Sequence, residues 1–269
     1  MMHSPAEVAK NYIGIGKGKA NMPAGRIFVL SIFAGMFIAF AAAGSATAAA
    51  TVENACIAKL ISGCIFPAGL AMVLVAGSEL FTGNCLLTIP LLEREITWTQ
   101  MLRNWIIVYL GNFVGSLFIS WAVNACHQLS LFNNGLAGAT IRTAVMKTSL
   151  SFPDALIKGI LCNVLVCIAV WMAFAAKDVA GKIIGLFFPI MLFVTSGFEH
   201  SVANMFYISV GLFAKSNPDY LAAAAADVSG LTWSSFLVGN LVPVTLGNII
   251  GGAVIVGAGY WLAYLKKSK

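Results

Sequence analysis

Long apolar runs separated by short polar segments are the dominant pattern along this chain of 269 residues. A helix needs about 20 residues to cross the roughly 30 Å hydrocarbon core of a membrane. The pattern therefore predicts six spanning segments, and charged residues concentrate between them. The segments cover about residues 27–50, 60–92, 105–126, 155–176, 183–213 and 236–265.

Composition strengthens this interpretation and excludes a water-soluble domain. Hydrophobic residues make up 59% of the chain and charged residues 10%, whereas a soluble domain has about 25% charged residues. The net charge of +6 comes from basic clusters that flank the outermost apolar runs. Such clusters are typical of membrane-flanking segments, so membrane lipid is an expected partner and nucleic acid is not.

The distribution of basic residues predicts the orientation of the chain. Six crossings place both termini on one side of the membrane. The segments on that side hold Lys10, Lys17, Lys19, Arg26, Arg94, Arg103, Lys177, Lys182, Lys266, Lys267 and Lys269, and those on the other side hold Lys59, Arg142, Lys147, Lys158 and Lys215. We therefore expect a multi-pass protein of the cytoplasmic membrane with both termini in the cytoplasm. The expected organisation is a cytoplasmic segment (1–26), a single transmembrane channel domain (27–265) and a cytoplasmic tail (266–269).

The transmembrane domain contains an internal repeat. The motif G-x-E-x4-N occurs at 77–84 and again at 197–204, each time after a Phe-Pro pair. A second motif, N-x6-G-N-x2-G, occurs at 104–115 and 240–251. The chain is thus predicted to be an all-α polytopic membrane protein whose six transmembrane helices form two three-helix repeats, at about 27–126 and 155–265. Three crossings per repeat place the repeats in opposite, inverted orientations.

Segments 60–92 and 183–213 are both too long for one plain crossing, and each carries an acid in its middle. We expect each to be two half-helices separated by a loop, at about Glu79–Asn84 and Glu199–Asn204. Broken backbone at membrane depth is tolerated where it lines a cavity or is packed in protein. Interrupted helices at equivalent positions of inverted repeats indicate a transport path, and half-helix N-termini attract anions.

Three ionisable residues lie inside these interrupted segments. Glu79 and Glu199 occupy equivalent positions, which favours a structural role in bracing the helix breaks over ion coordination. His200 has no counterpart because Leu80 stands at the equivalent position. A histidine beside a pore is able to donate or accept a proton near neutral pH. The alternative is a neutral histidine hydrogen-bonded within a helix bundle.

Other candidate chemistry is sparse. The six cysteines form no CxxC pair, and the three histidines are His3, His127 and His200. We therefore expect no metal, no cofactor and no enzymatic activity, since haem or metal ligation would need paired histidines. Lys147 precedes the fourth segment and either attracts anions or is a solvated loop charge. Asn112 and Asn248, with their neighbouring glycines, are consistent with helix packing as well as with a pore.

At these residues the chain resembles the formate/nitrite transporter family. The matching segments are Phe66–Leu70, Glu79–Thr82, Gly159–Asn163 with Trp171-Met172, Gly197–Met205 and Pro243–Gly252. The resemblance implies an aquaporin-like protomer, a homopentamer, and a separate pore in each protomer.

The resemblance also implies roles for individual residues. Phe66 and Phe193 would form one constriction of a central chamber; Leu70, Leu80 and Phe81 would form the other. His200 would face the chamber with Thr82, near Asn163 and Asn248. Lys147 falls at the position of a family lysine that is linked to the pore through the loop carrying Thr82. The segment from about Ser4 to Lys19 resembles a cytoplasmic gating helix, although its glycines at 14, 16 and 18 lower helix propensity.

The expected substrate is a small monovalent anion of a weak acid. Pro243 and the Asn248–Gly252 run resemble the formate branch of the family, with hydrosulfide and nitrite as alternatives. A proton from His200 would allow the neutral acid to cross the apolar constriction without losing charge hydration. Alternatives of another class are a neutral-solute pore, which paired Asn-Pro-Ala motifs would favour, and a membrane-embedded redox subunit.

Overall fold

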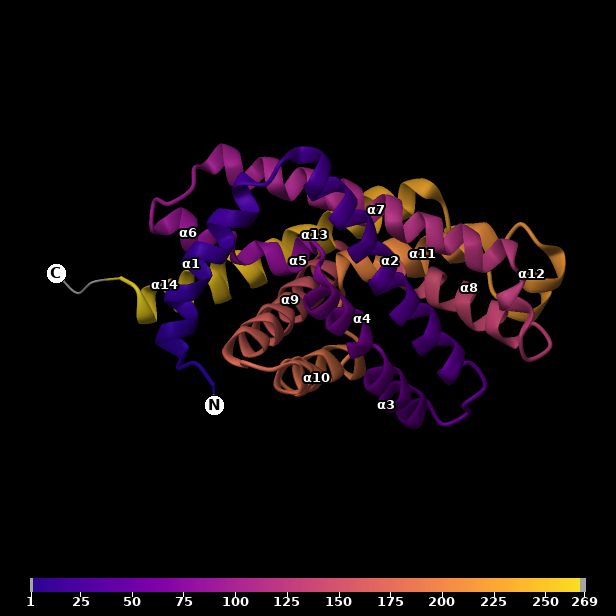
Figure 1. Cartoon of the computed structure of the whole chain (residues 1–269). Helices are drawn as coiled ribbons and strands as arrows, with labels where there is room; N and C mark the ends of the chain where they lie inside the picture. Colours follow the sequence, from indigo (N-terminus) through magenta and orange to yellow (C-terminus); the bar gives the residue numbers. More distant parts are fainter. Residues whose placement is uncertain (1, 267–269) are drawn as a thin grey trace.

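The computed structural model describes residues 2–266, and most of that chain is helical (Figure 1). Five helical stretches are long and apolar enough to cross a membrane. Three of them are single helices: α2 (Ala24–Ala49), α7 (Trp98–Ala125) and α9 (Phe152–Ala175). The other two are Ala55–Gly77 and Ser235–Tyr264.

These last two stretches are each built from several consecutive segments. The first contains α3 (Ala55–Ile65), α4 (Pro67–Met72) and a π-helical turn, Val73–Gly77. The final stretch contains α13 (Val242–Ile249) and α14 (Gly259–Tyr264), and each is preceded by a π-helical segment, Ser235–Leu241 or Ile250–Ala258.

The remaining crossing is made by two shorter helices, α10 (Val179–Thr195) and α11 (Ser201–Ala214). Together with the five long stretches they give the six predicted crossings. The predicted fold class is thus confirmed, including the two broken helices. The predicted tail lies outside the described residues except for Lys266.

Both breaks begin a few residues earlier than the motif suggested. The first separates Gly77 from α5 (Phe81–Asn84), which leads through a short 3-10 turn to α6 (Thr88–Leu92). The second separates α10 from α11 at residues 196–200. A glycine with positive φ precedes each acid, +87° at Gly77 and +70° at Gly197. Because L-residues rarely adopt this conformation, glycine determines where each first half-helix ends.

Three helices lie outside the six predicted segments: α1 (Pro5–Asn21), α8 (Gly135–Thr148) and α12 (Pro218–Ala224). Arg142 and Lys147, which lie between the third and fourth predicted segments, are therefore both in a helix, α8. Helix α8 is too short to span the membrane, but it packs along α11. Tertiary contact of this kind stabilises helices whose own sequence signal is weak.

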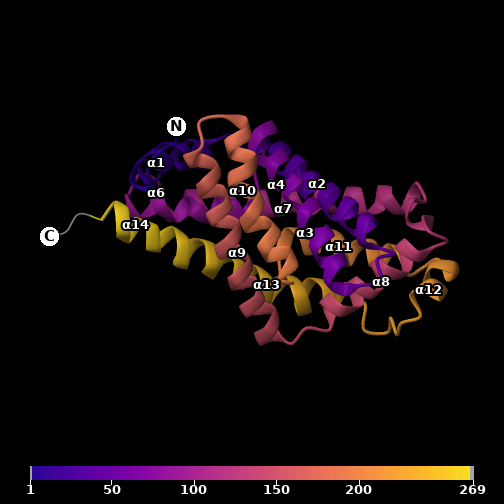
Figure 2. The same cartoon turned by 90° about the horizontal axis from the view of Figure 1, so that it is seen from below.

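Helix α1 is continuous despite its three glycines, so their low propensity does not break it. Ser4 and Glu7 form a reciprocal capping box at its start, which satisfies backbone donors there. At Gly16 an added Cβ would lie 2.7 Å from Pro90 Cγ, because α1 packs closely on α6. Figures 1 and 2 show α1 at the same end of the molecule as α6 and α14.

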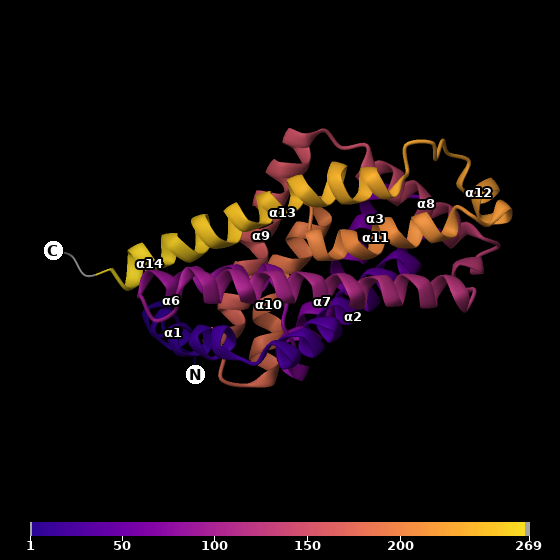
Figure 3. The ribbon, with the colours of Figure 1, turned by 90° about the horizontal axis from the view of Figure 1, so that it is seen from above.

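The two repeats pack in the same way. Helix α7 packs against α2, which lies beside it in Figure 3, and α13 packs against α9, which it crosses in Figure 2. Glycines permit this close approach, because an added Cβ at Gly115 would collide with Ile32 O and one at Gly251 with Ile160 O. The repeated glycines therefore serve helix packing, as the packing interpretation of these segments proposed.

Candidate permeation pathway

The break in the first repeat is held by a buried polar network centred on Glu79. Lys19 Nζ lies 2.6 Å from Glu79 Oε1, and Asn84 Nδ2 donates to Oε2 at 2.7 Å. Asn84 Nδ2 also donates to Asn104 Oδ1, whose own amide nitrogen donates to the carbonyl of Lys19. This network attaches α1 to the break, to α5 and to α7.

The second repeat carries the same network around Glu199. Lys147 Nζ lies 2.9 and 3.0 Å from the two carboxylate oxygens, and Asn204 Nδ2 donates to Oε2 at 2.6 Å. Asn204 also donates to Asn240 Oδ1, and Asn240 donates to the carbonyl of Lys147. Helix α8 thus occupies the place in this repeat that α1 occupies in the first.

Two further asparagines hold the extended backbone of the breaks. Asn112 Oδ1 accepts from the amide of Phe81, and its Nδ2 donates to the carbonyls of Glu79 and Ser31. Asn248 makes the equivalent contacts with Ser201 N, Glu199 O and Gly159 O. Asn248, a sequence-predicted pathway residue, therefore commits its donors and an acceptor to backbone.

His200 is the position at which the two repeats differ. It is buried at the start of α11, where its Nδ1 accepts the amide hydrogen of Ala203 at 3.0 Å. Its Nε2 lies 3.0 Å from the hydroxyl of Thr82, on the opposite repeat. With Nδ1 acting as acceptor, the proton of a neutral imidazole is on Nε2 and is donated to Thr82 Oγ1. The Thr82 hydroxyl then keeps its own hydrogen free to donate.

Asn163 supports Thr82 from behind. Its Nδ2 donates to the carbonyls of Thr82 at 3.2 Å and Asn248 at 2.7 Å. Its Oδ1 is buried and has no hydrogen-bond partner within residues 2–266. The structure thus brings His200, Thr82, Asn163 and Asn248 together, as the sequence analysis expected.

The predicted constriction residues divide into three groups. Phe66 and Phe193 are in edge contact with ring centroids 5.5 Å apart, and Phe193 also stacks on His200 at 5.8 Å. Leu70 and Leu80 line a cavity of only about 20 Å³ on the α1 side. Phe81 is buried and packs against Trp105 and Tyr109 in the protein core, with centroids 6.1 and 5.0 Å away.

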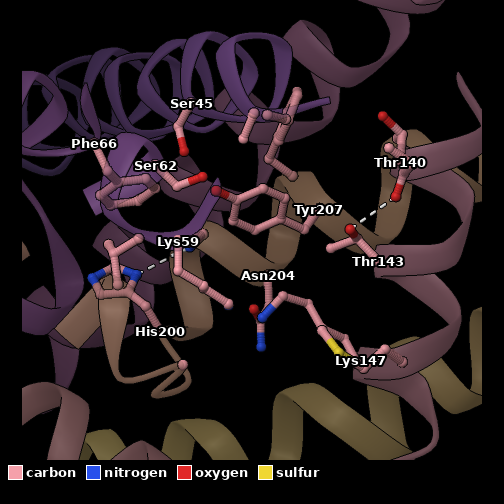
Figure 4. Close-up of a pocket in the computed structure, with 18 of the residues that line it drawn as sticks. Ser45, Lys59, Ser62, Phe66, Thr140, Thr143, Lys147, His200, Asn204 and Tyr207 are labelled. Carbon is pink, nitrogen blue, oxygen red and sulfur yellow. Dashed lines mark hydrogen bonds between the residues drawn. The ribbon is translucent and has the colours of Figure 1, made fainter. Parts of the chain in front are cut away.

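A larger cavity opens on the opposite side of His200, and we call it the vestibule (Figure 4). It has a volume of about 370 Å³ and extends from the ends of α3 and α8 to Phe66, Phe193 and His200. On the α1 side, Tyr12 is fully buried, packs on Phe174 and lines the small cavity. The vestibule therefore reaches as far as Phe66, Phe193 and His200, whereas only the small cavity lies under α1.

Lys147 is neither a solvated loop charge nor linked directly to the loop of Thr82. Its side chain is buried, contacts Glu199 and lies over the ring of Tyr207. Glu199 precedes His200 in the chain, so Lys147 is connected to His200 through that residue. The solvated-charge alternative is therefore wrong, because helix α8 buries this lysine against the second break.

Sequence reasoning missed Lys19 as the partner of Glu79 and left Asn84 and Asn204 without a role. A signal existed for all three. Both asparagines end the repeated G-x-E-x4-N motif. Lys19 and Lys147 each lie five positions before the first residue of a spanning helix, Ala24 or Phe152.

The buried pair gives a stability prediction. Glu199→Gln leaves Lys147 buried and unpaired, and we expect a loss of about 3–5 kcal/mol in the free energy of unfolding. Glu79→Gln should cost less because Lys19 is more exposed than Lys147, 19% against 10%. The matched control is Glu95→Gln, which removes an exposed pair with Lys17 and should cost about 0–1 kcal/mol.

Unfolding of the purified variants in detergent, followed by circular dichroism and size exclusion, measures these differences. If Glu199→Gln were as stable as Glu95→Gln, the pair would not hold the second break.

The sequence of the chain is similar to those of known proteins. The model of the "Formate/nitrite transporter" family matches residues 6–262. The chain is 39% identical to the "Probable formate transporter" of Methanothermobacter thermautotrophicus, over 98% of each protein. It is 37% identical to the "Formate channel FocA" of Escherichia coli (strain K12), over 98% of this chain and 95% of that protein.

Solved structures agree with these matches. A "Pentameric formate channel with formate bound" superposes with a TM-score of 0.81 at 35% identity, covering 90% of this chain and 98% of that one. An "FNT family ion channel" also gives a TM-score of 0.81, at 30% identity, covering 96% of this chain and 98% of that one.

Proposed function

Because the chain belongs to the formate/nitrite transporter family, we propose that it is a membrane channel that passes formate. The observation that carries the proposal is the His200–Thr82 pair, of which His200 lines the inner end of the vestibule. This pair is a small polar site beside apolar side chains, suited to a one-carbon carboxylate. Two relatives are named for formate, and one similar solved structure contains it.

The substrate meets opposing solvation requirements on its way. It is hydrated in the vestibule, but it then meets apolar side chains on both sides of His200. Phe66 and Phe193 lie on the vestibule side, and Leu80 lines the small cavity on the α1 side. An unpaired anion in such surroundings is strongly disfavoured. The Thr82 hydroxyl, polarised by His200, offers a hydrogen bond to the carboxylate at this point. Protonation to formic acid would remove the charge before the next apolar contact.

The hydrogen bonds of His200 determine which protonation state of its ring is able to deliver a proton. A neutral imidazole has only the Nε2 proton, and losing it would create an imidazolate. The donor must therefore be the imidazolium, in which Nδ1 also carries hydrogen. That hydrogen would face the amide of Ala203, so protonation opposes the N-cap bond of α11. We propose that His200 is charged only transiently, when an anion is present in the chamber.

Hydrosulfide and nitrite are alternative substrates of the same pore. Both are conjugate bases of weak acids, like formate, and both fit the same combination of hydroxyl donor and apolar walls. The name of the matching family includes nitrite. A neutral-solute pore is less well supported, because the vestibule carries lysines that favour anions.

We further propose a multi-pass location in the cytoplasmic membrane with both termini in the cytoplasm. The excess of basic residues on the terminal side supports this orientation. Helix α1, which closes the small cavity, then lies at the cytoplasmic mouth and the vestibule faces outward.

The substrate is tested by flux in proteoliposomes. We expect formate to move faster than nitrite and hydrosulfide, and glycerol not to move above protein-free vesicles. Stopped-flow light scattering or an internal pH dye measures all four solutes on one preparation. Glycerol flux equal to formate flux would support a neutral-solute pore instead.

The proton relay is tested by His200→Asn. Asparagine is a good N-cap, so its Oδ1 is able to accept from the amide of Ala203 while the titrating group is lost. We expect proton-linked formate flux to fall at least about tenfold, because general acid–base groups contribute roughly 10²–10⁴-fold to proton transfer. Assembly should be unchanged, and bare-anion current is expected to persist.

The matched control is Ser209→Ala, which removes a buried hydroxyl that bonds Ser120 and does not line the vestibule. This variant should conduct like the native protein. Flux with internal pH recorded separates the two variants. Unchanged proton-linked flux in correctly assembled His200→Asn would remove the histidine from the mechanism.

We also propose a homopentamer with one pore per protomer. A single protomer exposes many large apolar side chains, among them Ile106, Leu110 and Val114 along α7. These are able to face lipid or a second copy, and one similar structure is pentameric.

Native mass spectrometry from lipid-like detergent should show five copies. Chemical cross-linking in the membrane before extraction is the control against detergent-induced assembly. If native mass spectrometry showed only monomers, and these monomers conducted formate at the full rate per chain, the pentamer would be contradicted.

A further inference from the structure

The vestibule contains two lysines in different electrostatic situations. Lys147 is paired with Glu199, so its charge is compensated. Lys59, on α3, also lines the vestibule, is solvent-exposed, and has no carboxylate within 4.0 Å in the described chain. The charged lining residues are thus two lysines and one glutamate, with His200 neutral. The net charge of +1 is carried by Lys59.

The position of Lys59 follows from the helix and from the break opposite. Lys59, Ser62 and Phe66 are spaced by three and four residues, so they share one face of the α3–α4 stretch and all line the vestibule. Across the cavity, Lys59 Nζ lies 3.8 Å from the point that a Cβ on Gly197 would occupy. The ammonium group therefore lies beside the second break.

Hydroxyl groups surround the same space. Ser62 and Tyr207 line the vestibule, and Figure 4 shows their hydroxyls turned toward one another above Lys59. Phe66 lies beside Ser62 in the same view, and Phe193 contacts both Phe66 and His200. An ammonium with nearby hydroxyl donors is a suitable environment for a small anion that has not yet lost its hydration.

From this geometry we infer that Lys59, with the hydroxyls of Ser62 and Tyr207, forms a capture site for a small monovalent anion ahead of the Phe66–Phe193 contact. The inference rests on the proposed anion conduction. Lys147 has the structural role of bracing the break, and Lys59 raises the local anion concentration. An uncompensated charge acts over a longer range than the Lys147–Glu199 pair, whose opposite fields largely cancel.

The capture site also distinguishes the vestibule side of the protein from the α1 side. The repeat offset that relates Glu79 to Glu199 relates Lys59 to Val179, which is apolar. On the α1 side, the lysine that lines the small cavity, Lys19, is paired with Glu79. Anion capture is accordingly a property of the vestibule side alone.

The test is formate flux from the vestibule side of oriented vesicles, as a function of formate concentration and ionic strength. In Lys59→Gln the half-saturating concentration should rise roughly threefold to tenfold, while the maximal flux stays near that of the native protein. The ionic-strength dependence of flux at low formate should flatten, since screening acts on the removed charge. Lys59→Arg should restore both properties.

The matched control is Arg142→Gln, which removes an exposed positive charge on the same side of the membrane that does not line the vestibule. It should leave the half-saturating concentration within about twofold of the native value, because surface charges are well screened.

Each outcome decides one question. Native saturation and salt dependence in Lys59→Gln would overturn the capture site, as would an equal effect of Arg142→Gln. A native protein that passes no formate would contradict the proposed function instead. The same variants, measured with whichever anion is conducted, would then still test Lys59.

Discussion

Two interruptions of helical backbone inside the membrane are the constraint on which the rest of this structure depends. Unpaired amide and carbonyl groups at that depth have no water to bind, so each must find a partner in the protein. Asn112 and Asn248 supply these partners from helices α7 and α13. Close approach of those helices to α2 and α9 is possible because glycines replace larger side chains at the contact. Close helix packing and side-chain hydrogen bonding therefore act together to satisfy the backbone groups of the breaks.

The two buried acids also stabilise the breaks. Glu79 and Glu199 each join a lysine and an asparagine, and the lysines come from α1 and α8. A buried carboxylate is acceptable only when it is paired and hydrogen-bonded, and both conditions are met here. The consequence is that two helices outside the six crossings become structural components of the breaks. Helix α8 lies between α7 and α9 in the chain, and α1 precedes α2. The residues just before α1 pair with the end of α9, where the amide of His3 donates to the carbonyl of Ala175 at 2.8 Å.

The contacts around the two breaks are nearly equivalent, so the one position that differs, His200, is informative. Nearly every polar contact around one break is repeated around the other, but His200 faces Thr82 where Leu80 stands in the first repeat. A residue needed for bracing would be present twice. His200 also caps α11, so its chemistry and the start of that helix are coupled through one ring nitrogen. This coupling restricts when the imidazole is able to hold a second proton.

Sequence by itself determined the class of fold, the six crossings, the inverted repeat and the grouping of His200 with Thr82 and Asn163. These features follow from hydrophobic length, from motif repetition and from family resemblance, all of which are local in the chain. It did not determine the partners of Glu79 and Glu199, the burial of Lys147 or the free charge of Lys59. Those depend on side chains 52 or 60 residues apart meeting in space. Only the tertiary structure decides which of two similar lysines is neutralised and which remains available.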